Sequence, residues 1–219
     1  MKGPVIERLA RQHLLPKLSG FVARRSLVYR RPVEHFLYGL SFDTSSFTSS
    51  RIYVEAFVQP LFVREDGLWY TFGDRLGDDF WDVDEDDPDP TFAAIAEVAE
   101  RDALPFFEQL GSLDRFCELL PAWAEAEYKK LLSLQSLDDP VVSEAVGYAE
   151  ILRGRKEGGL EILENALESE REDDEYANEE RIANLERVLD AVTNLGLEAG
   201  QALLEQWRTE TIKNLRLEE

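Results

Sequence analysis

The chain opens with a segment whose apolar positions follow a helical period. In residues 4–19 apolar side chains recur at spacings of three and four residues, as at Val5 and Leu9, which places them on one face of a helix. Gly20 follows, where a helix commonly ends in a left-handed residue. Pro16 indicates that the last turn is distorted or that the helix ends early. We therefore predict an N-terminal amphipathic helix.

The pattern then becomes typical of strands. Runs rich in β-branched and aromatic residues follow at residues 21–31, 33–43, 51–63 and 68–72. Asp66-Gly67 separates the last two runs, and an Asp-Gly pair in this setting is a strong hairpin signal. Sequential strands joined by short turns favour an antiparallel meander with the N-terminal helix on one face. We predict this four-stranded sheet within residues 21–73.

Beyond an acidic bridge, the remaining pattern is helical. Asp89-Pro90 and Asp139-Pro140 each place a capping residue before a proline, which suits the start of a helix. Apolar periodicity continues beyond both, so we expect at least four helices after residue 89, packed as helical hairpins. The predicted fold class is α+β, with an antiparallel-sheet domain at residues 1–87 and an all-helical domain at residues 88–219.

The predicted helices pair in two ways. Gly154 separates two apolar stripes, one from Val142 to Leu152 and one from Leu160 to Leu167. This pair resembles a single tetratricopeptide-type unit with small residues where the helices would cross, and no clear second copy follows. Residues 182–192 have near-heptad spacing. We interpret them as part of an antiparallel pair, because a coiled-coil dimer would need more heptads.

The charge balance favours a basic partner. The 219 residues include 45 acids against 24 Lys and Arg, for a formal net charge of −21. Such a chain repels nucleic acid and anionic membrane surfaces and attracts basic proteins. We expect no nucleic-acid and no membrane partner. The alternative is that the acidity serves solubility alone.

The charge is also unevenly distributed. Residues 1–31 carry eight Lys or Arg residues and the single acid Glu7, for a net charge of +7. Acids are concentrated at residues 78–89 and 161–180. Either the basic segment packs beside acidic ones, or each surface faces its own partner.

The acids at residues 78–89, called the acidic segment below, are the candidate partner-binding surface. It consists of Asp78, Asp79, Asp82, Asp84, Glu85, Asp86, Asp87 and Asp89. Carboxylates so close together repel one another, and a cationic partner would relieve that repulsion. We predict that they contact a basic protein. The alternative is a hydrated linker whose acids favour the N-terminus of the next helix.

The other chemical signals are weak. A calcium loop that begins at Asp82 would need Gly at its sixth position and Glu at its twelfth. The chain has Asp87 and Ala93 there, so we predict no metal site. Cys117 is the only cysteine and lies in an apolar stretch, which favours a buried, inert thiol. His13 lies on the apolar face of the first helix, where a packed imidazole is the simplest interpretation. No cofactor motif and no catalytic residue is identified.

The N-terminal region resembles a known group of proteins. A helix, then Gly20-Phe21, then Arg24, Tyr29 and Arg30 before a polar-turned antiparallel sheet, resemble uncharacterised small bacterial α+β domains. Some of those are suspected immunity proteins of toxins. The resemblance covers the first third of the chain and implies protein binding without catalytic residues.

These observations favour one function over two others. The expectation is an acidic protein-binding module of the cytoplasm, since charges interrupt any N-terminal export signal, acting as an immunity or inhibitor protein for a basic partner. The alternative is an enzyme, or an enzyme accessory subunit, with a polar pocket between sheet and helices. A third interpretation is a self-associating structural protein. The pattern does not determine the oligomeric state.

Overall fold

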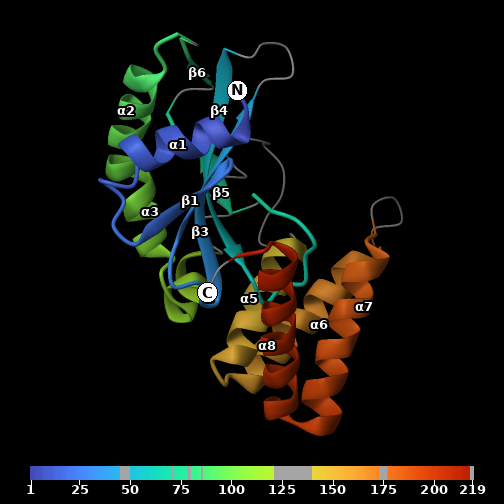
Figure 1. Ribbon diagram of the computed structural model, residues 1–219. Coiled ribbons are helices and arrows are strands. Elements are labelled where there is room, and N and C mark those ends of the chain that lie inside the picture. The colour runs from blue at the N-terminus through green and yellow to red at the C-terminus, as the bar shows by residue number, and fades with distance from the viewer. Residues whose placement is uncertain are drawn as a thin grey trace. The chain divides into compact units, whose positions relative to one another are not determined.

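The computed structural model has an α+β architecture (Figure 1). It describes residues 1–44, 50–70, 72–77, 80–84, 86–120, 140–172 and 177–217. The chain forms two compact units, one of residues 1–59 and 68–108 and the other of residues 60–67 and 109–217. An N-terminal helix, an antiparallel sheet and a helical C-terminal half confirm the predicted fold class.

The first unit is built on a twisted sheet. Its strands are β1 (Phe21–Arg24), β2 (Leu27–Arg30), β3 (Phe36–Thr44), β4 (Arg51–Pro60), β5 (Gly73–Arg75) and β6 (Trp81–Asp82). Their order is β1-β2-β3-β4-β5, and β6 also pairs with β4. The order follows the sequence, as a meander requires. Within the described residues, no strand follows β6.

The first predicted strand is a hairpin. Residues 21–31 divide into β1 and β2, which pair antiparallel with Arg24 opposite Leu27. Arg25 lies in the turn with a φ of 53°. Glycine or asparagine usually occupies a turn position with positive φ. Because Arg25 occupies it here, the sequence did not indicate this turn.

The predicted strand at residues 68–72 is absent among the residues described there. Residues 61–70 and 72 connect β4 to β5, and Asp66-Gly67 lies in a bend of this connection. The tight turn predicted at Asp66-Gly67 is therefore wrong, although β4 and β5, on either side of this connection, pair antiparallel as the strands of a hairpin do. The aromatic side chains that suggested a strand pack instead, with Tyr70 edge-on to Phe57 at 5.0 Å between ring centres.

Three helices pack with this sheet. They are α1 (Gly3–His13), α2 (Asp89–Val98) and α3 (Leu104–Gln109), and a π-helical turn, η1 (Ala99–Ala103), joins the last two. The ring of Phe92 in α2 stacks on Phe42 at 5.8 Å, and Phe107 in α3 stacks on Phe21 at 5.9 Å. Helices α2 and α3 thus share the core of the sheet. The compact units therefore divide the chain differently from the boundary predicted after residue 87.

The second unit is a bundle of helices. Residues 113–120 are helical, followed by α5 (Pro140–Leu152), α6 (Lys156–Glu172), α7 (Glu179–Asp190), η2 (Ala191–Leu195) and α8 (Leu197–Asn214). The predicted helix starts near Pro90 and Pro140 are confirmed, and so is the number of helices. Asn178 caps α7 by accepting the backbone N–H groups of Glu180 and Arg181.

Glycines allow α5 and α6 to approach closely. A Cβ atom at Gly159 would lie 2.6 Å from the Cδ1 atom of Ile151 and 3.2 Å from the carbonyl oxygen of Gly147. Only a residue without a side chain fits there unless its neighbours shift. This contact joins the two helices of the predicted hairpin.

Candidate functional site

The structure describes five of the eight predicted partner-binding acids. Asp82, Asp84, Asp86 and Asp87 are exposed and Asp89 is half-buried. The other three, Asp78, Asp79 and Glu85, lie outside the described residues.

The acidic segment is attached to the first unit at both ends. Asp82 forms an ion pair with Arg51, with 3.0 Å between Oδ1 and Nε. The Asp89 carboxylate lies 2.8 Å from Nε2 of His13, which connects α2 to α1. Asp86 and Asp87 form no ion pair with any residue that the structure describes. Their carboxylates are available to solvent or to a partner.

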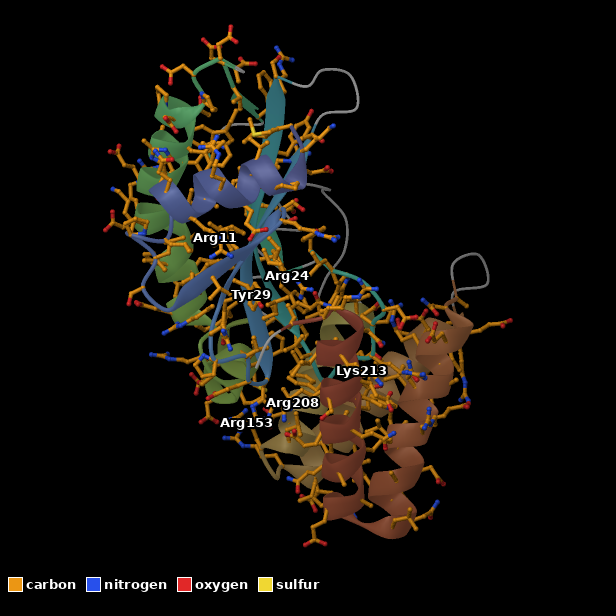
Figure 2. All side chains as sticks on the ribbon, in the orientation of Figure 1. Arg11, Arg24, Tyr29, Arg153, Arg208 and Lys213 are labelled. Atoms are coloured by element: carbon orange, nitrogen blue, oxygen red, sulfur yellow. The ribbon has the colours of Figure 1, made fainter. Side chains whose placement is uncertain are left out.

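Two of the basic N-terminal residues are engaged within the first unit. Arg11 forms an ion pair with Glu7 at 2.8 Å and donates a hydrogen bond to the carbonyl oxygen of Ala23. Lys17 pairs with Glu100 of η1 at 3.1 Å. Figure 2 shows Arg11 on α1 and Arg24 on β1. Part of the basic segment thus stabilises the fold locally, as exposed pairs do to a small extent.

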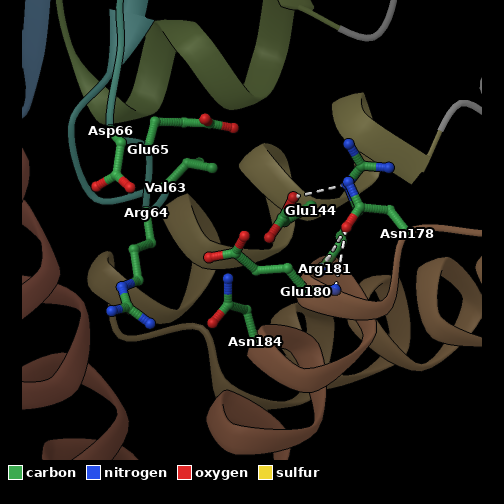
Figure 3. A pocket seen from close by; sticks show the side chains of 9 residues that line it. All are labelled: Val63, Arg64, Glu65, Asp66, Glu144, Asn178, Glu180, Arg181 and Asn184. Atoms are coloured by element: carbon green, nitrogen blue, oxygen red, sulfur yellow. Dashed lines mark hydrogen bonds and ion pairs between the residues drawn. The ribbon is translucent and has the colours of Figure 1, made fainter.

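A polar cavity lies within the second unit (Figure 3). Its volume is about 210 Å³. The loop after β4, helix α5 and the start of α7 supply its lining, which consists of Val63, Arg64, Glu65, Asp66, Glu144, Asn178, Glu180, Arg181 and Asn184. Sequence reasoning did not bring these residues together.

A network of buried charges forms one wall of this cavity. Nε of Arg181 lies 3.3 Å from Oε2 of Glu144, and its Nη1 lies 2.9 Å from Oε2 of Glu170. Both glutamates are almost fully buried. One arginine thus joins α5, α6 and α7, and removing it would leave two buried acids without their ion-pair partner.

Burial shifts the titration of Glu144. Loss of water contact raises the pKa of this carboxyl from its ordinary 4.5 to about 7, although the Arg181 charge acts in the opposite direction. The neighbouring Tyr148 hydroxyl is also buried, and its pKa is raised by desolvation and by the Glu144 charge. It forms no hydrogen bond of ordinary geometry with the described residues. Glu144 therefore changes protonation near neutral pH.

Glu65 contributes a second carboxyl to the cavity. Partial burial raises its pKa, and the nearby charges of Glu180 and Asp66 add to that effect while Arg181 opposes it. Among the residues that the structure describes, four acids and two arginines line the cavity. The local charge is therefore negative.

Asn184 of α7 is the most unusual polar group in the lining. The residue is only 6% exposed. Its side-chain amide forms no hydrogen bond within the described part of the chain. Figure 3 shows the nitrogen of this amide on the side of the Glu180 carboxyl group and its oxygen on the opposite side. The amide atoms are not among the polar atoms that are cut off from solvent, and the residue lines the cavity, so this group is a candidate for ligand binding.

Cys117 lies beside a second buried arginine. Arg153 (Figure 2) lies 2.6 Å from a carboxylate oxygen of Asp114 and 2.6 Å from one of Glu150. The thiol of Cys117 is half-buried, so the prediction that it is buried is only partly correct. Desolvation raises its pKa to about 12. A neutral thiol is a poor nucleophile.

One signal for the cavity was present in the sequence. Glu144 lies within an apolar helical run, at spacings of four and seven residues from Tyr148 and Ile151. Those spacings place the acid on the buried face of its helix. An acid on such a face must be paired or have a raised pKa. Its partner Arg181 could not be read from spacing.

Two features are absent from the described residues, a cluster of metal ligands and a helix that could span a membrane. No group of three or more His, Cys, Asp or Glu side chains within those residues is arranged to hold a metal ion. No helix within them is long and apolar enough to cross a bilayer.

The fold and site define an α+β protein whose helical unit carries a polar, acidic cavity. Comparison with protein-family models, with curated proteins and with solved structures gives no match.

Proposed function

We propose that the protein binds a basic protein partner in the cytoplasm, as an immunity or inhibitor protein does. The observation that carries the proposal is a net charge of −21 together with exposed carboxylates at Asp84, Asp86 and Asp87. The fold does not neutralise this charge through ion pairs of Asp86 and Asp87 with described residues.

Charge of this kind acts mainly on association. Complementary potentials steer a partner toward the binding surface and exclude partners of the wrong sign. The same negative field disfavours nucleic acid as a partner, because phosphates are repelled. A basic toxin, such as a nuclease, has the charge that this surface would select.

A second candidate function is catalysis, or support of catalysis, at the polar cavity. Glu144 has a pKa of about 7 there, and a carboxyl that titrates near neutral pH can act as a general acid or base. Catalysis would require a substrate to enter the cavity, whereas binding of a partner at the acidic segment would not. A loss of activity in Glu144→Gln with partner binding intact would favour it.

Capture from the native host tests the binding function. Three forms of the protein serve as bait, namely the wild type, a variant with Asp84, Asp86 and Asp87 changed to Asn, and a control with Glu157, Glu161 and Glu164 of α6 changed to Gln. The control residues are also exposed, so both variants lose the same charge from different surfaces. A basic protein held by the wild type and the control, and held less by the Asp→Asn variant, is the expected result. Equal capture by all three baits contradicts a role for the acidic segment.

A further inference from the structure

We propose that the cavity of the helical unit binds a positively charged group, the guanidinium or ammonium of an Arg or Lys side chain on the basic partner. This inference rests on the proposed function and names where that partner is recognised. It is carried by the cavity, by the charges around it and by the unpartnered amide of Asn184.

The arginines of the lining already have partners. Arg181 lies between Glu144 and Glu170, and Arg64 pairs with Glu210 of α8 at 3.9 Å. Glu65 and Glu180 have no ion-pair partner among the described residues. These two carboxylates of the lining therefore lack an ion pair with a described residue, and a bound cation would supply one.

Asn184 supplies the neutral contact. Its amide oxygen can accept a hydrogen bond from an N–H group, and the residue is 6% exposed. The amide atoms keep contact with solvent through the cavity, so a ligand there can reach them. A guanidinium or ammonium in the cavity would donate a hydrogen bond to the amide oxygen, once rotation of the amide turns that oxygen toward the cavity, and would face the carboxylates at the same time.

The size of the cavity limits the ligand. Its volume of about 210 Å³ is smaller than the roughly 300–1,000 Å³ of pockets that enclose drug-sized ligands or cofactors. The head group of one long side chain fits such a space. The carboxylate lining excludes phosphate or other anions.

The site also makes binding depend on pH. Glu144 on α5 faces Tyr148 of its own helix, Arg181 of α7 and Glu65 of the loop after β4, and Glu180 and Asp66 lie near Glu65. A bound cation favours the charged form of both Glu144 and Glu65 and so releases protons. Affinity is therefore higher above neutral pH than below it.

The test uses Nα-acetyl-argininamide as the cationic probe and Nα-acetyl-citrullinamide as its uncharged isostere (argininamide and citrullinamide below), because the acetyl group removes the charge of the α-amine. Binding is followed by NMR shift changes in the full chain, at pH 6 and pH 8. Argininamide is expected to shift the Asn184 side-chain signals saturably and to bind more tightly at pH 8, while citrullinamide does not bind. Glu65→Gln should weaken argininamide binding about tenfold, the loss of one charge-assisted hydrogen bond.

The control variant is Glu164→Gln, on the exposed face of α6, which should bind the probe like the wild type. Glu65 lies on a loop and is half-buried, so its substitution should leave the fold intact by circular dichroism. Any of three results would overturn the site. They are a wild-type protein that shows no saturable shifts with argininamide, citrullinamide binding as tightly as argininamide, or equal argininamide affinity of Glu65→Gln and Glu164→Gln.

A third probe separates the two sources of a cation. A tripeptide with a central arginine and both ends capped should bind at least as tightly as argininamide if a protein side chain is the occupant. Failure of the tripeptide alone overturns that source and assigns the site to a free small cation. Failure of all cationic probes removes the site but leaves the partner-capture result standing, so the two proposals can fail separately.

Discussion

Glu144 is an acid on the buried side of α5, with an exposed fraction of 5%. The ion pair with Arg181 stabilises the charged form of Glu144, whereas the loss of water on burial favours its neutral form. Because its pKa in the folded protein is about 7 and its ordinary value is 4.5, the folded state binds the proton more tightly than the unfolded chain. Folding is therefore linked to pH through this residue.

The sign of that link gives a first prediction. The tighter proton binding by Glu144 in the folded state adds to the free energy of unfolding. This contribution is fully present below pH 4.5 and is lost as pH rises through about 7. Wild type should lose on the order of 3 kcal/mol more unfolding free energy than Glu144→Gln between pH 5 and pH 8. Urea unfolding followed by circular dichroism measures both. Parallel pH dependences for the two proteins would show that Glu144 titrates normally.

Cys117 gives a second prediction at the same scale. Because its pKa is raised to about 12, little thiolate exists at neutral pH. A thiol reagent should label the folded protein about tenfold more slowly, or slower still, than the protein unfolded in urea. The single cysteine makes the readout direct. Equal rates in both states would mean that the half-buried thiol is neither shielded nor protonated as described.

At the scale of elements, the contact of α5 with α6 depends on glycine. Gly158 and Gly159 are neighbours in α6, yet a Cβ at Gly158 would meet nothing within 4 Å, whereas one at Gly159 would meet Ile151 and the backbone of Gly147. The two positions therefore separate helix propensity from helix packing.

This pair of glycines gives a third prediction. Gly159→Ala should lower the free energy of unfolding by about 1–3 kcal/mol, because it overpacks the crossing. Gly158→Ala should raise it by about 0.5–1 kcal/mol, because alanine favours a helix over glycine. Thermal and urea unfolding compare both with the wild type. The same sign of change for both variants would contradict the close approach of the helices.

At the scale of the whole molecule, charge is the dominant property. The chain carries −21 overall, although its first 31 residues carry +7. Many exposed acids act together as a field, whereas a single exposed pair contributes little to stability. A functional effect of this charge should therefore appear in association kinetics.

The fourth prediction concerns these kinetics. With a captured partner, changing Asp84, Asp86 and Asp87 to Asn should slow association about tenfold at low salt, and added salt should reduce the difference because it screens exposed charges. The unfolding midpoint should barely change. Stopped-flow or surface-binding rates provide the measurement, with the α6 variant as control. An unchanged association rate would leave the acidic segment as a solubility device.

Local patterns predicted much of the fold. The N-terminal helix and the helix starts near Pro90 and Pro140 are confirmed, because helical periodicity depends on neighbouring residues, although Val5 is exposed while Leu9 is buried. The predicted capping role of Asp89 is wrong, since Pro88 precedes the first turn of α2 and no side chain caps it, and Asp139 lies outside the described residues. The hairpin at Arg25 was missed, since a residue with a side chain adopts the positive φ there. The run at residues 68–72 has strand-like composition, but aromatic packing uses its side chains in the connection to β5.

The sequence by itself determined the fold class, the starts of α1, α2 and α5, and the sign and amount of charge, because these properties are local or additive along the chain. Only the tertiary structure decided that α2 and α3 share the core of the sheet, and that Glu65, Glu144 and Arg181 meet at one cavity. Those residues are far apart in sequence, and their proximity depends on which buried faces pack together. Burial then sets the titration of Glu144, which no spacing of residues can specify.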